Sequence, residues 1–245
     1  MSVPTNPQQT KPSFMGTDTP GRLDVEFTME SPDFLPGGGP EHMIIGLDPI
    51  PDSIVPCFAA GTLIAGPEGE RRVEDLAIGD PVTTADGRSV AVKWIGRTTV
   101  SPRFRPAERL DPVRIRAGAF GDGVPACDLM VTADHGMVLD GMVINAGALV
   151  NGTSVQRIDW RCLGDSLTYY HVETEAHDVI QANGAAAETY VDYVARTSFD
   201  NFAEYLALYG QETAVAELAM PRISAARLVP EALRARLAAG DRQTA

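Results

Sequence analysis

Between Cys57 and about Tyr193 the chain is a succession of short runs of β-forming residues, separated by turns rich in glycine, proline and acidic residues. Each apolar run is a few residues long, which is strand length rather than helix length. Many short strands at regular turn spacing are typical of all-β folds. A chain of 245 residues has room for one sizeable domain or two small ones, so we predict one all-β domain over residues 56–193.

Turn signals assign individual strands within this segment. Asp86-Gly87 is a dipeptide favoured in two-residue hairpin turns, and it predicts a hairpin between residues 81–84 and 89–94. Residues 67–70 predict a second turn. Further strands are expected at 62–65, 72–73, 113–116, 129–132, 137–139, 142–144, 155–158, 167–172 and 179–181.

A weak internal repeat accompanies these strands. The pattern Leu-x-x-Gly-x-x-Val occurs at residues 76–82 and again at residues 149–155. Each copy predicts one helical turn that ends at glycine and is followed by a strand. The repeat is consistent with a duplicated architecture.

The two ends of the chain differ from this segment. Residues 1–55 are rich in Pro, Gly, Thr and Gln, and we predict a disordered or extended leader in which Met43–Leu47 alone adds an edge strand. After about residue 193 Ala, Leu and Glu dominate, with apolar residues at helical spacing. A helical tail is therefore predicted over residues 194–245, with helices at 201–209, 212–220 and 231–239.

The composition of the chain limits the kinds of partner that it can bind. With 33 acidic against 20 basic residues the formal charge is −13, which argues against nucleic acid because phosphate contacts need clustered Lys and Arg. No secretory signal pattern and no apolar run of membrane-spanning length is visible. We expect a soluble chain, cytoplasmic or secreted without a visible signal. Three cysteines leave at least one unpaired, so no disulfide framework is predicted.

Cys57 and its surroundings carry the chemistry. A cysteine thiolate is a nucleophile, and attack on the Pro56 carbonyl would turn the Pro56–Cys57 peptide bond into a thioester. The leaving amide nitrogen must be protonated, and a histidine such as His135 can supply a proton near physiological pH. Thr132, three residues earlier, can hydrogen-bond the scissile amide. The combination predicts that the chain cuts its own backbone.

Four segments, taken together and in this order, resemble the hedgehog/intein (Hint) self-processing family, most of all the bacterial Hint-domain proteins that are not splicing inteins. Each segment alone is common, whereas four in the family's order are specific. They are Cys57–Thr62, Val73–Val82, Thr132-x-x-His135, and Tyr170–Val172 leading to His177–Gly184.

The resemblance implies a flat, horseshoe-like all-β fold with pseudo-twofold symmetry. It also implies that Cys57 is the nucleophile, that Thr132 orients the amide and that His135 is the general acid. His177 is a fourth catalytic candidate, although it can equally be a turn residue that orders the loop before Val179.

The chain departs from a splicing intein after Ala182-Asn183-Gly184. Such an intein would continue with three residues, a His-Asn pair and an acceptor Cys, Ser or Thr, whereas three alanines and Glu188-Thr189-Tyr190 follow here. Without the cyclising asparagine and the acceptor, full splicing is not expected. Cleavage at Pro56–Cys57 is the reaction that is still expected. Its substrate is the N-terminal segment, and water or an external thiol or amine resolves the thioester. The Pro56 ring crowds the carbonyl, so slow or conditional cleavage is expected.

The remaining cysteines and histidines have structural interpretations. Cys127 and Cys162 are predicted to be small buried hydrophobic residues, and His171 and Trp94 are assigned to packing. A zinc site made by Cys57, Cys127, His135 and His177 would lack any tight ligand spacing, so no metal or cofactor is predicted.

Two functions of different classes stay open. The intact set of Cys57, Thr132 and His135 favours self-processing, whereas Pro56 and the missing asparagine favour a degenerate Hint fold that acts as a non-catalytic binding or assembly module. A hydrolase acting on other molecules has little support, because no Gly-x-Ser-x-Gly elbow and no phosphate-binding loop is present.

Overall fold

The structure, a computed structural model, describes residues 23–28, 42–47, 56–100 and 111–240. The chain divides into two compact units, residues 1–52 and 53–245. In the first unit β1 (Leu23–Thr28) and β2 (His42–Leu47) pair antiparallel, with Leu23 opposite Leu47. The strand predicted at 43–47 is thus confirmed, and it has a partner strand that the sequence did not predict. The rest of the predicted leader lies outside the described residues.

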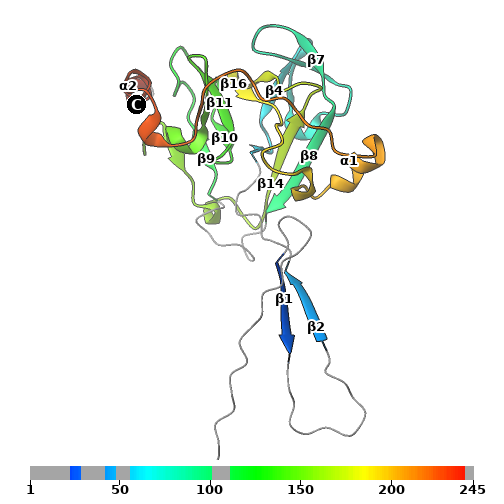
Figure 1. The fold of residues 1–245 in the computed structure, drawn as a ribbon. Coiled ribbons are helices and arrows are strands. Elements are labelled where there is room, and N and C mark those ends of the chain that lie inside the picture. Colours follow the sequence, from blue (N-terminus) through cyan, green and yellow to red (C-terminus); the bar gives the residue numbers. More distant parts are fainter. Residues whose placement is uncertain (1–22, 29–41, 48–55, 101–110, 241–245) are drawn as a thin grey trace, which may run out of the picture. The chain divides into compact units, whose positions relative to one another are not determined.

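The second unit is all-β, as predicted, and Figure 1 shows its strands. One sheet has six strands in the order β13-β9-β10-β3-β14-β8, and another has seven in the order β17-β12-β11-β16-β15-β4-β5; β6 and β7 pair separately. The six strands are β3 (Phe58–Ala59), β8 (Trp94–Val100), β9 (Val113–Ile115), β10 (Leu129–Val131), β13 (Val155–Arg157) and β14 (Leu167–Glu173). The seven are β4 (Leu63–Gly66), β5 (Gly69–Arg72), β11 (Gly136–Leu139), β12 (Met142–Asn145), β15 (Val179–Ala182), β16 (Ala185–Glu188) and β17 (Arg222–Ile223).

The structure bears on two turn predictions made from the sequence. The hairpin around Asp86-Gly87 is confirmed, because β6 (Pro81–Thr83) and β7 (Ser89–Ala91) pair antiparallel. In both Leu-x-x-Gly segments the glycine has positive φ, but the short 3-10 turn lies earlier than predicted, mostly or wholly before the segment. These turns are η1 (Val73–Asp75), before Gly79 at φ +88°, and η4 (Ala146–Leu149), before Gly152 at φ +80°. Further 3-10 turns are η5 (Trp160–Cys162), η6 (Arg196–Ser198) and η7 (Ala226–Leu228).

The sequence analysis missed the hairpin of β15 and β16. Asn183 and Gly184 form its turn, both with positive φ, 48° and 76°. Alanine-rich β16 has low β propensity, so composition gave no sign of it. The Asn-Gly dipeptide was the available signal, because it favours the same two-residue turn as Asp-Gly.

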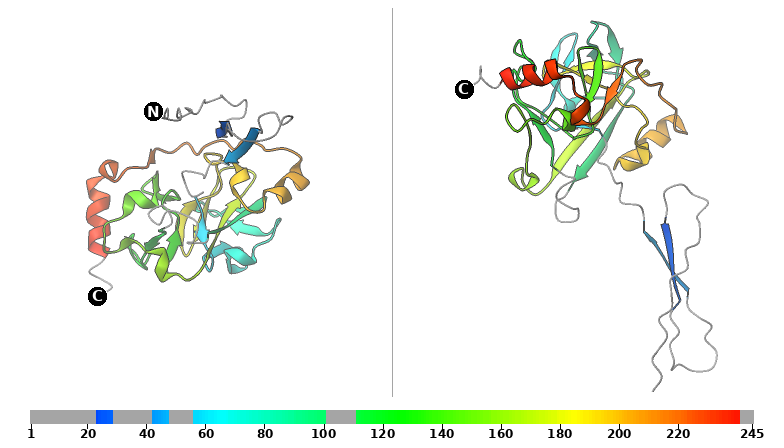
Figure 2. Two further views of the ribbon diagram at one scale, coloured as in Figure 1. Left: turned by 90° about the horizontal axis from the view of Figure 1, so that it is seen from below. Right: turned by 60° about the vertical axis from the view of Figure 1, so that its left-hand side comes forward.

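The helical tail is partly confirmed. Helices form at α1 (Phe202–Tyr209) and α2 (Glu231–Gly240), but the helix predicted over 212–220 is wrong. Gly210, in the left-handed region at φ +74°, ends α1. The following segment is extended because its groups bind the β domain: Thr213 Oγ1 lies 3.1 Å from Lys93 Nζ, and the Leu218 N–H donates to His177 Nδ1 at 3.0 Å. Figures 1 and 2 show that the segment joins two helices at opposite ends of the unit.

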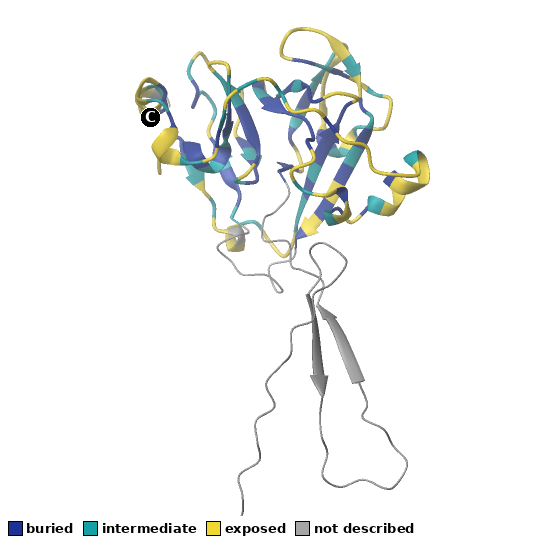
Figure 3. Ribbon diagram, in the orientation of Figure 1, coloured by how far each residue is buried: buried dark blue, intermediate teal, exposed yellow. Residues whose placement is uncertain are grey.

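The interior contains two hydrophobic clusters. Figure 3 shows that buried residues lie mainly on the strands and that the two helices are largely exposed. Phe58 belongs to the cluster that contains most core residues of both sheets, whereas Cys57 and Ala59 belong to the aromatic cluster around Trp94 and Tyr169. Opposite faces of a strand expose alternate residues, so β3 separates the two clusters.

A buried ion pair attaches the segment after β16 to β14. Arg196 donates twice to Glu173, at 2.9 Å each, and both side chains are almost fully buried. The guanidinium also lies 4.4 Å from the Tyr190 ring centre and 4.7 Å from that of Tyr205. Bidentate pairing and contact with aromatic faces suit arginine. No helix in the described residues combines the length and apolarity needed to cross a membrane.

Candidate active site

The position of Cys57 follows from β3, which lies between β10 and β14 in the six-stranded sheet. Phe58 is opposite Val131 on β10 and opposite Tyr170 on β14. Cys57 immediately precedes this strand and is fully buried, and Pro56 is buried as well. The peptide bond between them therefore lies in the interior, flanked by the ends of two other strands.

Thr132 contacts the amide of that peptide bond. The Cys57 N–H donates to Thr132 Oγ1 at 2.8 Å, and the Thr132 N–H donates to the Cys57 carbonyl at 3.0 Å. Thr132, the residue after β10, thus continues the hydrogen bonds between β10 and β3 and contributes its side chain to them. A hydroxyl oxygen here can fix the orientation of the Cys57 nitrogen, the atom that would leave if the thiol attacked Pro56.

His135 lies one tight turn after Thr132, closed by the bond from the His135 N–H to the Thr132 carbonyl at 3.2 Å. Its ring centre is 4.2 Å from that of Phe58 and 5.5 Å from that of His171. Neither ring nitrogen has a hydrogen-bond partner among the described residues. Burial lowers the pKa of His135 to about 4, with Glu188 opposing and Arg222 adding to the effect.

His171, which the sequence analysis assigned to packing, packs against the rings of Tyr190 and Phe199. On β14 Tyr169 is opposite Ala59 and Tyr170 is opposite Phe58, so the next step of the register brings His171 across from Cys57. Its ring is buried, and no described residue forms a hydrogen bond with either nitrogen. Burial and the neighbouring His135 lower the pKa of His171 to about 3. Only strand register reveals this neighbour, which no spacing in the sequence encodes.

The thiol and a phenol are both kept neutral in this region. Burial raises the pKa of the Cys57 thiol well above its ordinary value. Burial, and after it electrostatic interactions with Cys57 and Asp111, raise the pKa of Tyr169, whose hydroxyl has no hydrogen-bond partner in the described structure. The resting site therefore holds a protonated thiol beside neutral imidazoles.

His177 is held by Glu188 and by the backbone of Leu218. Its Nε2 lies 3.2 Å from Glu188 Oε2, and its Nδ1 accepts the Leu218 N–H at 3.0 Å, so both ring nitrogens are occupied. Glu188 also accepts the Gly136 N–H at 2.8 Å and hydrogen bonds from Arg222. Burial alone would raise the pKa of Glu188, but hydrogen bonds from His177 and Arg222 outweigh it and hold the pKa at about 2. The alternative interpretation of His177 as an ordering residue agrees with these contacts.

Comparison with known proteins identifies the family. A family model described as the Hint domain matches residues 56–194, more than half of the chain. The chain belongs to the Hint domain family. No curated protein matches it.

Solved structures similar to this Hint domain include inteins. The MchDnaB-1 intein (N145AA) is 19% identical over 54% of this chain and 99% of that chain, with a TM-score of 0.40. The gp41-1 intein is 11% identical, covering 55% and 98%, with a TM-score of 0.40. A bacterial intein-like domain from Clostridium thermocellum is 14% identical, covering 56% and 100%, with a TM-score of 0.41.

The other two cysteines of this Hint domain are exposed, so the prediction that they are buried is wrong. Cys127 lies in a bend before β10 and Cys162 ends the 3-10 turn η5. Neither position belongs to a strand that faces the core. Among the described residues, no group of three or more His, Cys, Asp or Glu side chains is arranged to hold a metal ion.

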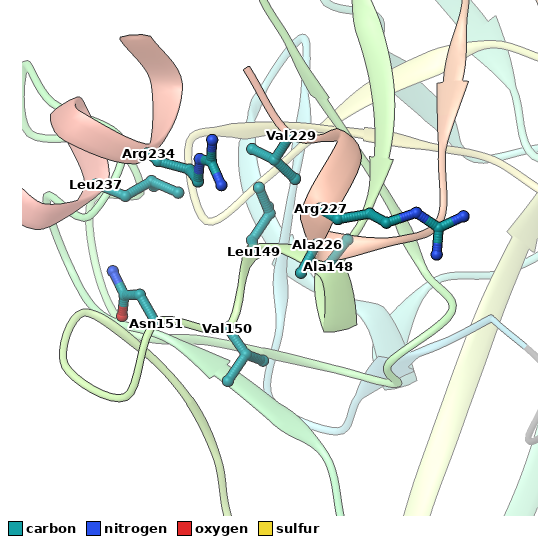
Figure 4. A pocket seen from close by; sticks show the side chains of 9 residues that line it. All are labelled: Ala148, Leu149, Val150, Asn151, Ala226, Arg227, Val229, Arg234 and Leu237. Carbon is teal, nitrogen blue, oxygen red and sulfur yellow. The ribbon is translucent and has the colours of Figure 1, made fainter. Parts of the chain in front are cut away.

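The pocket in Figure 4 is separate from these residues. It has a volume of about 360 Å³ and lies where η7 and α2 meet η4. Leu149, Val229 and Leu237 supply apolar wall, and Arg227 and Arg234 also line it. None of Cys57, Thr132 and His135 contributes to it, so it marks how the helical tail packs on the Hint domain.

Proposed function

We propose that this Hint domain cleaves its own backbone once, at the Pro56–Cys57 bond. The Cys57 sulfur attacks the Pro56 carbonyl carbon, the C–N bond breaks, and the acyl group passes from nitrogen to sulfur. Water or an external thiol or amine then resolves the thioester and releases the segment that ends at Pro56. The substrate is the chain's own N-terminal segment.

The observation that most supports this proposal is the hydrogen bond from the Cys57 N–H to Thr132 Oγ1, at 2.8 Å. A threonine hydroxyl held against the nitrogen of this one peptide bond is what N–S acyl transfer needs to orient its leaving group. His135, one turn further along, packs on Phe58, the residue next to the nucleophile. General acid catalysis needs the donor within hydrogen-bond reach of the Cys57 nitrogen, directly or through one water.

The same surroundings predict a slow reaction. The buried thiol stays protonated at neutral pH because burial raises the pKa of Cys57, and a thiol is a far weaker nucleophile than a thiolate. Pro56 is buried as well, so the thioester would be accessible only to small nucleophiles or after local opening.

The proposal stops at N-terminal cleavage. Asn183, the asparagine nearest the end of the matched segment, sits in the β15–β16 turn. Its Oδ1 accepts the Leu63 N–H at 2.7 Å, and its Nδ2 donates to the Asp128 carbonyl at 2.9 Å. An amide engaged on both sides is poorly suited to attack its own backbone, which agrees with the absence of the intein ending.

A second candidate is the non-catalytic binding or assembly module. The burial of Pro56 and Cys57 and the protonated resting thiol favour it, because the same features describe a structural cysteine.

Intact-mass spectrometry distinguishes self-cleavage from a non-catalytic binding or assembly module. Purified protein is incubated with dithiothreitol or hydroxylamine, and we expect a fragment that ends at Pro56 and one that begins at Cys57. Cys57→Ala should release neither. Cys127→Ala is the matched control, because it removes an exposed thiol and should release both fragments as the wild type does. A single unchanged mass in the wild type under all conditions would favour the binding module.

A further inference from the structure

The chain continues past the residues that match the Hint domain, and one part of this continuation contacts the candidate active site. The family match ends at residue 194, whereas β17 (Arg222–Ile223) lies in the helical tail. β17 pairs in parallel with β12, with Arg222 opposite Val143, and the Val143 N–H donates to the Pro221 carbonyl at 2.9 Å. The tail therefore adds a strand to the seven-stranded sheet.

The side chain of Arg222 reaches a buried carboxylate on another strand. Its Nη1 donates to Glu188 Oε1 at 3.2 Å and its Nη2 to Glu188 Oε2, although β12 and β11 lie between the two strands. Nη1 also donates to Asn145 Oδ1 at 3.3 Å. The Glu188 side chain is almost fully buried, and a buried carboxylate keeps its charge only when it is paired. Arg222 supplies that pairing with the two-point geometry that suits a carboxylate.

Glu188 in turn holds the backbone next to His135. Its Oε1 accepts the Gly136 N–H at 2.8 Å, and Gly136 directly follows His135. A Cβ at Gly136 would overlap Glu188 Oε1, so the carboxylate lies directly against this backbone. The His135 carbonyl accepts the Ala146 N–H at 2.9 Å. The chain is thus fixed on the C-terminal side of His135 by one contact from β16 and one from η4.

The position of the His135 ring depends on this backbone. Neither ring nitrogen has a hydrogen-bond partner in the part of the chain that the structure describes, so no polar contact there fixes the ring directly. Its place is set by packing on Phe58, at 4.2 Å between ring centres, and by the turn that begins at Thr132. A shift of a catalytic group by about 1 Å can cost roughly 10²-fold in rate. Loss of the support at Gly136 should therefore slow a reaction that uses His135.

The tail contacts Glu188 by a second route as well. His177 Nε2 lies 3.2 Å from Glu188 Oε2, and His177 Nδ1 accepts the N–H of Leu218, which precedes β17 in the tail. The ring centre of Tyr193 lies 4.7 Å from the Arg222 guanidinium and restrains that side chain. Both routes end at one carboxylate, so Glu188 connects the tail with the turn that carries His135.

We propose that Arg222 is a positioning residue of the proposed cleavage: it holds the Glu188 carboxylate against the Gly136 N–H and thereby fixes the turn that carries His135. The tail segment that ends in β17 is then part of the active site's framework, although it lies outside the matched residues 56–194. Arg222 acts through Glu188 and takes no part in the bond changes at Cys57. The inference rests on the proposed function.

Dithiothreitol-induced release at Pro56–Cys57 is measured by mass spectrometry for the wild type, Arg222→Met, Arg222→Lys and Arg236→Met. Arg236 is the matched control, because this second tail arginine also binds a carboxylate of the β11–β12 hairpin, Asp140, at 3.0 and 3.1 Å, but at the opposite end of β11 from Gly136. We expect Arg222→Met to slow release by roughly 10²-fold. Arg222→Lys should slow it less, because lysine keeps the charge but contacts the carboxylate at one point. Arg236→Met should release at the wild-type rate.

A second readout follows the His135 ring by NMR titration in the Cys57→Ala background, whose chain should stay intact. Burial lowers the pKa of His135, Glu188 opposes this effect and Arg222 adds to it. Without Arg222 the ring should therefore titrate at a higher pH. Arg222→Lys should restore most of the original titration, and Arg236→Met should leave it unchanged.

Release at the wild-type rate in folded Arg222→Met would overturn the positioning role and leave the proposed function standing. If circular dichroism shows that Arg222→Met is unfolded, Arg222→Lys decides, and the wild-type rate in that variant overturns the role. Equal losses in the Arg222 and Arg236 variants would also overturn it, because a loosened tail would then explain both. So would a His135 titration that does not depend on Arg222. If the wild type and Cys57→Ala both stay intact, the proposed cleavage itself fails and the positioning role fails with it.

Discussion

Two groups of buried polar side chains lie on the same strand, β14, and they differ in how they are satisfied. Glu173, at the end of the strand, is paired with Arg196 by two hydrogen bonds and approached by Lys93 at 3.5 Å. Tyr169 and His171, four and two residues earlier, have polar atoms without any hydrogen-bond partner among the described residues. Glu173 is ion-paired, whereas burial favours the neutral forms of Tyr169 and His171.

This difference distinguishes buried polar groups that stabilise the fold from buried polar groups that are available for catalysis. Complete pairing is the usual state of buried charge, and it attaches one chain segment to another. Unpaired polar atoms cost stability, so a group of them beside a cysteine needs another explanation. The paired groups should therefore control stability and the unpaired groups should control the cleavage rate.

The largest expected effect concerns the unpaired group. His135→Ala should slow thiol-induced release by roughly 10²–10⁴-fold, the usual contribution of a positioned acid or base. Mass spectrometry gives the rate, and circular dichroism checks that the variant is folded. A folded variant with the wild-type rate would remove His135 from the mechanism.

Substitutions in the Glu173–Arg196 pair should change the stability of the protein. Arg196→Met keeps the volume of the side chain but leaves Glu173 buried with Lys93 alone, so the free energy of unfolding should fall by about 3–5 kcal/mol. Urea unfolding measures this change. The double variant Glu173→Gln, Arg196→Met should recover much of the loss. A single variant as stable as the wild type would contradict the proposed attachment.

Acid should destabilise the protein through the two histidines. Folding lowers the pKa of His135 from 6.5 to about 4 and that of His171 to about 3. As the pH falls below 6.5 the unfolded chain binds protons that the folded protein does not, so stability present at pH 7 is progressively lost. Between pH 7 and 5 each histidine should remove roughly 2 kcal/mol. Urea unfolding at both pH values tests this, and His171→Gln should show a smaller loss.

The smallest effect is expected at Tyr169. Tyr169→Phe removes a buried hydroxyl that has no hydrogen-bond partner in the described structure, so the free energy of unfolding should stay within about 1 kcal/mol of the wild type or rise. Thermal unfolding measures it. A large loss would reveal a partner for this hydroxyl and weaken the contrast between the two groups.

The sequence predicted the architecture because its signals are local. The hairpin at Asp86-Gly87 and the glycines at 79 and 152 are turn preferences of one or two residues, and they hold in the structure. The helix predicted over 212–220 failed for the opposite reason. Its residues have helical composition, but contacts of Thr213 and Leu218 with distant strands keep the segment extended.

The candidate active site also combines features that the sequence predicted with features that only the structure shows. Thr132 and His135 are three residues apart in a tight turn, so their association could be read from the motif, whereas the contact of Thr132 with the Cys57 nitrogen depends on the pairing of β10 with β3. From the sequence, His177 was the catalytic candidate and His171 was assigned to packing. The structure pairs His177 with Glu188 and leaves His171 unpaired across from Cys57.

The order of residues alone determined the all-β class, the family resemblance and the identity of the candidate nucleophile, because strand periods, turn dipeptides and motif spacing are properties of neighbours along the chain. Only the tertiary structure decided which histidine faces Cys57, which is paired, and that the thiol is protonated at rest. Those properties depend on strand register and on burial, which bring together residues more than a hundred positions apart and remove them from water.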